Sequence, residues 1–502
     1  MTPILVGPKI QYEIKVGNRT YKTIDILSNF AAHTIVGRAT RVLLVRDVKS
    51  QEEFVLKDVW LAKGRQPEHE VRSNLLDDIQ AKLGEPEMKE VERHLFTPIN
   101  HCIVQTQVNG KAVDDDTDEV IMRKVDLSGV KQFSVMDSIQ EKHTVEAVGQ
   151  TPHTSEHVNT RATKPNAKGI THRYHYRIVY KEYATPLYEV NRLSLVMMTL
   201  EDLVKGRSCL PLQSSDSAQF FLVLNIFHRA GWVHRDISAG NVFLLQKHEL
   251  FKLGDLELAK KMGKESKDGE HDVRTVRIIL FSMPFVLPSQ TKGTLDFMSV
   301  EVERQGYLFI PVDSNVKFFY HNSLHELESV WWLATWILFF HYPVGTAATG
   351  SLNTQKAAVN ELFPRILPND RLVFIRFPRK FERIVKSLHV DFHPYGNKMD
   401  NLRASLQKAY SNFEAYLVNE DSIEYINNFS DNSLDGIHEA FRLMFREMKE
   451  ELNRSGNDIK LTRLHKVTED VKRKLEPGSD DVQGKRSRYV LCSFEVWWYD
   501  FN

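Results

Sequence analysis

The sequence of 502 residues predicts an α+β fold in which a small β-rich N-terminal lobe precedes a larger, mainly helical C-terminal lobe. Residues 1–130 alternate short β-like runs with turns, and strand character returns at residues 174–180. Beyond about residue 190, apolar residues recur mostly at helical spacing. A polar run at residues 234–241 is bounded by apolar segments and lies just inside the helical part.

The N-terminal lobe is assigned to residues 1–185. Its strand-like runs are short and rich in apolar residues, with examples at 12–16, 41–45 and 53–57. A single helical pattern follows at about 67–83. Residues 134–171 are polar and carry no sustained period, which predicts a surface insertion or a disordered loop.

The C-terminal lobe is assigned to residues 186–475. Residues 215–230 are apolar almost all round and end at Gly231, which is a good helix stop. Apolar residues from Ile437 to Leu452 recur at steps of three and four, as in an amphipathic helix. Residues 476–502 form a polar linker and a short aromatic tail.

Composition favours an ordinary intracellular globular protein. Lys+Arg and Asp+Glu both total 66, so no net charge favours nucleic acid or membrane partners. The three cysteines lie too far apart for a disulfide framework or a metal cluster, which favours a reducing compartment. The N-terminus lacks a signal-peptide pattern, and the most apolar stretch, 330–340, is shorter than the roughly 20 residues that cross a bilayer. We therefore expect a cytoplasmic or nuclear location.

The polar run at 234–241 reads His-Arg-Asp-Ile-Ser-Ala-Gly-Asn and places Asp236 and Asn241 five positions apart. Phosphoryl transfer uses such a pair, because an Asp accepts the proton of the attacking hydroxyl and an Asn oxygen holds Mg²⁺ on the nucleotide phosphates. The apolar flanks predict a tight loop that leads into a buried strand. Asp236, Asn241 and Arg235 are therefore predicted catalytic residues, with Arg235 positioning the loop.

Lys57 ends a strand-like run and is predicted to hold the α- and β-phosphates of a nucleotide, although a surface lysine on an edge strand is the alternative. Gly37 lies 20 residues upstream, where a hairpin covering the phosphates would turn. Glu68 has apolar residues three and seven positions later, so it faces inward and can pair with Lys57. Glu70 is the alternative partner for Lys57, but its side chain would face another side of the helix.

Asp255 lies 19 residues after Asp236, at the end of a strand that is predicted to pair with residues 242–245. That position suits the carboxylate that bridges Mg²⁺ to the phosphates, whereas a capping aspartate in a turn is the alternative. In the sequence Asp-Leu-Glu, Leu256 is expected to pack inward. Glu257 stands where protein kinases usually have glycine, so it restricts movement of this segment and adds a negative charge near the metal site.

Residues 293–301 match the end of a protein-kinase activation segment, with Ser-Val-Glu in place of Ala-Pro-Glu. Small-molecule kinases lack such a segment. Glu301 is expected to make a buried structural ion pair. Glu326 is expected to brace the backbone of the catalytic loop from a buried helix, or to be only a favourable carboxylate at a helix N-terminus.

Four stretches together resemble the fungal-type protein kinase family, a group within the eukaryotic protein-kinase-like fold. They are 54–60, 234–241, 293–301 and 325–329. The resemblance covers roughly residues 20 to 345 and extends to the helices up to about residue 470. It implies a bilobal protein-kinase-like fold, ATP with Mg²⁺ as cofactors, and transfer of the γ-phosphate to Ser or Thr hydroxyls of a protein substrate.

The resemblance also assigns roles to individual residues: Lys57, Glu68, Asp236, Asn241 and Asp255. The adenine would lie near residues 179–184, where Glu182 is a predicted nucleotide-binding residue. Ser238 stands where Ser/Thr kinases carry the lysine that helps to neutralise the γ-phosphate. A phosphorylated Ser or Thr in the activation segment would pair with Arg235.

Three alternatives stay open at this point. The first is a pseudokinase that keeps the fold and scaffolds partners. The second is a small-molecule phosphotransferase acting on an aminoglycoside- or choline-like alcohol, which residues 293–301 oppose. The third is a helical interaction protein with a chance motif, which the joint spacing opposes. The partners expected are ATP and a protein substrate, without nucleic acid or membrane and with no defined oligomeric state.

Overall fold

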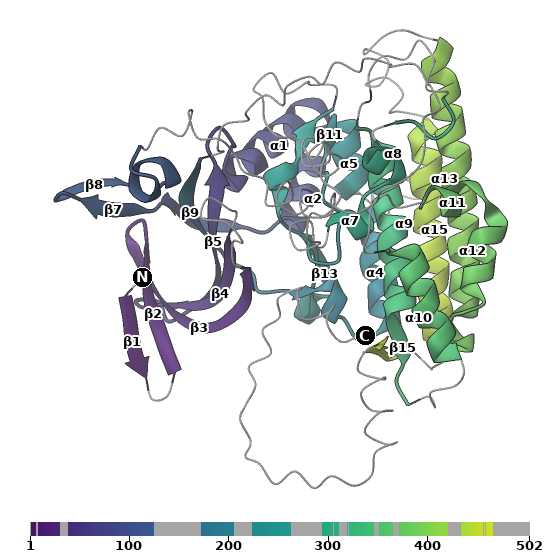
Figure 1. The fold of residues 1–502 in the computed structure, drawn as a ribbon, viewed down its shortest axis with the longest axis horizontal. Coiled ribbons are helices and arrows are strands. Elements are labelled where there is room, and N and C mark those ends of the chain that lie inside the picture. Colours follow the sequence, from purple (N-terminus) through teal and green to yellow (C-terminus); the bar gives the residue numbers. More distant parts are fainter. Residues whose placement is uncertain are drawn as a thin grey trace, which may run out of the picture.

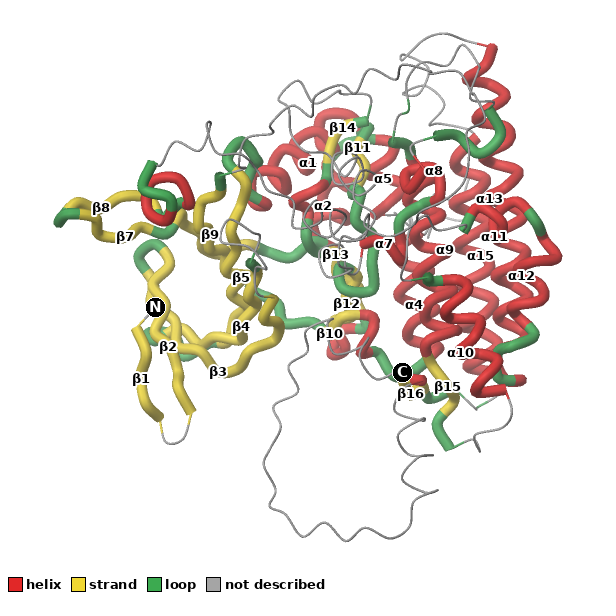
Figure 2. The backbone as a smooth tube through the Cα atoms, viewed as in Figure 1, coloured by secondary structure: helices red, strands yellow, loops and turns green. Residues whose placement is uncertain are grey.

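The protein is described here by a computed structural model. The described residues are 2–6, 9–30, 39–124, 172–204, 223–262, 294–304, 306–310, 319, 321–345, 351–364, 371–419, 433–454, 456 and 458–464. A curled β-sheet forms the N-terminal part, and helices form most of the C-terminal part (Figures 1 and 2). The predicted α+β arrangement, with a β-rich N-terminal part and a mainly helical C-terminal part, is therefore confirmed.

The N-terminal sheet has seven antiparallel strands in the order β1-β2-β3-β4-β5-β9-β6. Its strands are β1 (Thr2–Val6), β2 (Lys9–Val16), β3 (Arg19–Phe30), β4 (Thr40–Asp47), β5 (Glu53–Ala62), β6 (Pro98–Ile103) and β9 (Arg173–Tyr180). Successive side chains of β5 point to opposite faces. Leu56 therefore packs with one apolar cluster, and Val59 with another on the face that also carries Lys57.

Two helices follow β5, not the single one that the sequence predicts. Helix α1 (Glu68–Lys82) confirms the helical pattern at 67–83. Helix α2 (Glu85–His94) begins after Gly84, whose φ of +113° favours glycine and separates the two helices. The sequence analysis missed α2, a short and largely charged helix that buries Val91 and His94.

The C-terminal part contains helices, short strand pairs and a buried core. Its helices are α4 (Leu193–Val204), α5 (Val223–Arg229), α7 (Thr294–Phe297), α8 (Val300–Arg304), α9 (Ser323–Phe340), α10 (Ser351–Leu362), α11 (Leu372–Arg376), α12 (Pro378–Val385), α13 (His393–Asn419) and α15 (Ser433–Arg454). The short strands are β7 (Gln105–Val108) and β8 (Lys111–Asp114) in the N-terminal part, and β10 (Thr185–Pro186), β11 (Trp232–Val233), β12 (Val242–Leu245), β13 (Leu250–Leu253), β14 (Lys260–Lys261), β15 (His341–Pro343) and β16 (Leu461–Arg463).

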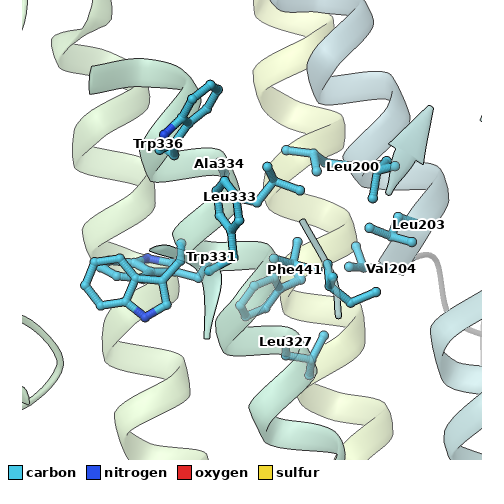
Figure 3. Packing of buried hydrophobic residues seen from close by; sticks show 14 of the residues in the cluster. Leu200, Leu203, Val204, Leu327, Trp331, Leu333, Ala334, Trp336 and Phe441 are labelled. Carbon is cyan, nitrogen blue, oxygen red and sulfur yellow. The ribbon is translucent and has the colours of Figure 1, made fainter. Parts of the chain in front are cut away.

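Helices α4, α9 and α15 form the centre of the helical core (Figure 3). Leu200 of α4 and Phe441 of α15 lie beside the apolar α9, which includes the fully buried Trp331 and Trp332. The amphipathic helix predicted from Ile437 to Leu452 is confirmed as α15. Within the described residues, no helix combines the length and the hydrophobicity needed to cross a membrane.

Several sequence predictions fall outside the described residues. They include Gly37, the insertion at 134–171, part of the helix expected at 215–230, and the tail at 476–502. The lobe boundaries at 185 and 475 stay predictions.

Gly396 in α13 lies tightly against α12, because a Cβ added there would approach Val385 Cγ1 to 2.7 Å. We expect Gly396→Ala to destabilise the protein by about 1–3 kcal/mol through overpacking, measured by urea denaturation. Gly436→Ala in α15 is the matched control, since a Cβ there meets no heavy atom within 4 Å. It should raise stability by about 0.5–1 kcal/mol through helix propensity. Equal effects of the two changes would contradict the packing described for α13.

Candidate active site

The ammonium group of Lys57 joins three separate elements. Its Nζ lies 2.8 Å from Glu68 Oε2 on α1 and 2.8 Å from Asp255 Oδ1 after β13. The side chains of Lys57 and Glu68 are only 12% and 11% exposed. Burying a cation to this extent costs free energy unless the cation is paired. Here the ammonium group of Lys57 has two carboxylate partners. The predicted Lys57–Glu68 pair is therefore present, and it extends to the predicted metal ligand.

Asp255 is held in an unusual backbone conformation at the end of the β12–β13 hairpin. Its φ is +59°, in the left-handed region that non-glycine residues rarely adopt. The backbone N–H of Gly254 donates to the carbonyl of Asn241 at 2.9 Å, which ties the two predicted metal ligands to one hairpin. Leu256 is buried in the large helical core, as expected, and its N–H donates to Glu68 Oε1 at 3.2 Å.

The predicted catalytic loop, residues 234–241 between β11 and β12, is held by buried polar groups. His234 Nδ1 accepts the N–H of Asp236 at 3.3 Å, so its Nε2 carries the proton that is donated to the Gly254 carbonyl at 3.1 Å. Arg235 has a φ of +71°, and its N–H donates to Glu326 Oε1 at 2.6 Å. Glu326 on α9 thus braces the loop backbone, as predicted.

Glu326 stays ionised because its hydrogen bonds outweigh its burial. Burial disfavours the charged carboxylate, but the hydrogen bond and charge of His228, and the N–H of Arg235, lower the pKa of Glu326 below its usual value. The distance from His228 Nε2 to Glu326 Oε2 is 2.7 Å. His228 lies on α5, so two helices fix the position of the loop.

Asp236 and Asn241 are joined within the loop. Asn241 Nδ2 donates to Asp236 Oδ2 at 2.9 Å and to the Asp236 carbonyl at 3.0 Å. With its amide nitrogen committed in this way, Asn241 has its carbonyl oxygen as the atom that a cation would bind. A small cavity beside Asp236 is lined by residues of the loop, of α7 and α8, and of the start of α9.

The donors brought together here suit Mg²⁺. A carboxylate on Asp255 and a carboxamide oxygen on Asn241 are hard oxygen ligands, and Mg²⁺ typically takes one or two protein ligands plus phosphate oxygens and waters. Among the described residues, no group of three His, Cys, Asp or Glu side chains is placed to hold a metal ion by itself. A metal held by Asp255 and Asn241 would share its coordination with the bound nucleotide.

Sequence comparison agrees with this geometry. The sequence model of the fungal protein kinase family matches residues 4–338. The chain belongs to the fungal protein kinase family. Among solved structures, it is similar to the Cydia pomonella granulovirus kinase PK-1, with 12% identity, a TM-score of 0.33, and coverage of 77% of this chain and 87% of that chain. A comparison with curated proteins found no match.

Membership of the family makes this protein a kinase-like phosphotransferase. The family also implies ATP and usually a divalent metal. Of the residues that the sequence assigns to this kinase's site, the structure brings together Lys57, Glu68 and Asp255 in one cluster, and Arg235, Asp236 and Asn241 in the adjoining loop.

The side chain of Glu182 connects the N-terminal sheet with the β12–β13 hairpin. Its carboxylate accepts the N–H and hydroxyl of Thr97 at 2.9 and 2.8 Å and pairs with Lys252 Nζ at 2.9 Å. Burial opposes ionisation, but these hydrogen bonds lower the pKa of Glu182. The side chain thus has a structural task that the sequence did not indicate, and its contact with a nucleotide stays a prediction.

Glu257 is neutralised by a partner that sequence analysis missed. Its side chain is 3% exposed, and its Oε1 lies 3.1 Å from Nη1 of Arg65 in the loop between β5 and α1. The negative charge expected near the metal site is therefore compensated. No local sequence pattern predicts this pair, because the two residues lie 192 positions apart.

The buried partner that the sequence predicts for Glu301 is present, since His325 Nε2 lies 2.8 Å from Glu301 Oε2 and both side chains are buried. Burial raises the pKa of Glu301 to about 8 and lowers the pKa of its partner His325 to about 4, so the two groups share a neutral hydrogen bond of 2.8 Å. A buried ion pair is formed by Glu303, two residues later. Arg371 Nη2 lies 2.9 Å from Glu303 Oε2 and also donates to the Met298 carbonyl.

The raised pKa of Glu301 predicts a pH-dependent stability. The folded state holds a proton that the unfolded chain releases near pH 4.5, so this contribution is complete below pH 4.5 and is lost as the pH rises towards about 8. We expect the free energy of unfolding of the wild type to fall by up to about 1.4 kcal/mol per pH unit over part of this window.

Glu301→Gln should flatten that dependence, measured by urea denaturation between pH 5 and 8. Glu414 faces Glu301, and burial together with its contact with Glu301 raises its pKa too, so some slope should remain. The exposed Glu382→Gln on α12 is the control and should leave the slope unchanged. An equal slope in Glu301→Gln and the wild type would rule out a buried proton on Glu301.

Proposed function

We propose that this kinase is an ATP-dependent protein kinase that transfers the γ-phosphate to Ser or Thr hydroxyls of protein substrates. The observation that carries the proposal is the convergence of Glu68 and Asp255 on the ammonium of Lys57, next to the hydrogen-bonded pair Asp236 and Asn241. Phosphoryl transfer depends on positioning and charge neutralisation, and these are the groups that such catalysis requires.

Each group has a distinct task in the proposed mechanism. Lys57, oriented by Glu68, would hold the α- and β-phosphates, and Asn241 and Asp255 would hold Mg²⁺. The metal, when bound, neutralises charge that develops on the phosphates. Asp236 orients the acceptor hydroxyl and accepts its proton.

A protein substrate is favoured by the segment that precedes α9. Helices α7 and α8 are fastened by Arg371, which donates to the carbonyls of Asp296 and Met298 and pairs with Glu303. They form one wall of the cavity beside Asp236. A hydroxyl-bearing side chain would approach Asp236 along this wall.

A pseudokinase scaffold is the second candidate, and one observation favours it. Ser238 is buried in the catalytic loop, where Ser/Thr kinases carry a lysine, so the γ-phosphate lacks that charge. The intact Lys57, Asp236 and Asp255 favour an active enzyme.

Asp236→Asn should separate these candidates. An asparagine keeps the size of the side chain but cannot accept a proton, so we expect phosphate transfer from ATP to generic protein substrates to fall by about 10²–10⁴-fold. Binding of Mg²⁺–nucleotide, measured by calorimetry, should be retained. Asp77→Asn, an exposed change on α1, is the control and should leave both quantities unchanged.

The wild-type measurement decides between the candidates. Mg²⁺-dependent nucleotide binding without transfer to any protein would favour the pseudokinase. Transfer to an aminoglycoside or to choline, with none to protein, would favour a small-molecule phosphotransferase.

A further inference from the structure

Three consecutive residues after β13 are each held by a group from residues 57–68. Lys57 Nζ contacts Asp255 Oδ1 at 2.8 Å, and Glu68 Oε1 accepts the N–H of Leu256 at 3.2 Å. Arg65 Nη1 contacts Glu257 Oε1 at 3.1 Å. The first two contacts serve the proposed active site directly. The third has no such task, and it depends on a glutamate at a position where kinases usually have glycine.

The Arg65–Glu257 pair is not an ordinary surface ion pair. The Glu257 side chain is almost fully buried and that of Arg65 is 25% exposed. A carboxylate in this position is costly unless a cation stays beside it, so the pair resists separation. The Arg65 end is itself fixed, because the hydroxyl of Tyr174 on β9 donates to the Arg65 carbonyl at 3.2 Å.

The position of Asp255 makes such a support necessary. Its left-handed backbone conformation is strained for a residue with a side chain, and it persists only while neighbouring contacts hold it. Glu257 lies two residues later, in the middle of the short helical turn Leu256–Leu258. A contact that fixes Glu257 therefore restricts the backbone that carries Asp255.

We propose that Arg65 is a positioning residue which, through Glu257, holds Asp255 in its metal-binding orientation. As a consequence, residues 255–257 can leave this orientation only if the loop between β5 and α1 releases them. The metal site of this kinase is thereby controlled from the N-terminal lobe by an ion pair as well as by Lys57 and Glu68. The part of the inference that concerns Mg²⁺ rests on the proposed function.

Hydrogen exchange of the nucleotide-free protein tests the restraint without reference to catalysis. In Arg65→Gln, a buried carboxylate loses its cation, and amide exchange in residues 253–259 should become faster than in the wild type. Arg46→Gln is the matched control, because Arg46 on β4 pairs with Glu53 at 2.7 Å in an exposed ion pair. Unchanged exchange at 253–259 in Arg65→Gln would overturn the proposal.

The double variant Arg65→Gln/Glu257→Gln tests whether the two residues act as a pair. Glu257→Gln removes the charge that needs a partner, so the double variant should exchange more slowly than Arg65→Gln alone. Additive effects of the two changes would contradict the pairing. If Arg65→Gln does not fold, Glu257→Gln alone tests the restraint. Amide exchange in residues 253–259 should then be faster in Glu257→Gln than in the wild type.

Calorimetry with ADP then tests the link to the metal. In Arg65→Gln, affinity for ADP in the presence of Mg²⁺ should fall by about 10–100-fold, as for other residues that support a metal ligand. Affinity in the presence of EDTA should stay near the wild-type value. An equal loss with and without Mg²⁺ would overturn the link to Asp255. A wild type that binds no Mg²⁺–ADP would contradict the proposed function, while the exchange measurement would still decide the restraint.

Discussion

The ammonium group of Lys57 between the carboxylates of Glu68 and Asp255 is the interaction on which the site depends. Each of the three groups comes from a different element, and each is partly or largely removed from water. Separating them would leave charges unpaired in a medium of low dielectric constant, which is strongly unfavourable. The cluster therefore fixes β5, α1 and the end of β13 relative to one another.

The catalytic loop is fixed from the opposite side by the helical core. Glu326 on α9 holds the Arg235 backbone, and His228 on α5 keeps Glu326 charged. His234 connects the loop to Gly254, next to Asp255. The loop and the segment that carries Asp255 are therefore held together rigidly, and such preorganisation is what phosphoryl transfer needs from a protein.

Sequence analysis succeeded where the physical signal is local. The amphipathic period of α15, the alternation of β5 and the fixed spacing from Asp236 to Asn241 depend on residues close together in the chain. The inward direction of Glu68 followed from helical geometry alone.

It failed where the partner is distant or the pattern is faint. Sequence analysis missed the short, largely charged helix α2, and Arg65 meets Glu257 only because the fold brings them together. Glu301 has the buried partner that was expected, but burial favours the neutral forms of Glu301 and His325, and the sequence did not indicate the ion pair between Arg371 and Glu303. Ion pairs of this kind follow from the tertiary packing, which residue spacing does not reveal.

A crystal structure of the wild-type protein with ADP and Mg²⁺ would test the account most directly. We expect a metal ion about 2.0–2.1 Å from oxygens of both Asp255 and Asn241. Lys57 should contact the nucleotide phosphates while its bond to Glu68 is kept. A metal bound without either residue, or a nucleotide bound with Lys57 turned away from Glu68, would contradict the account.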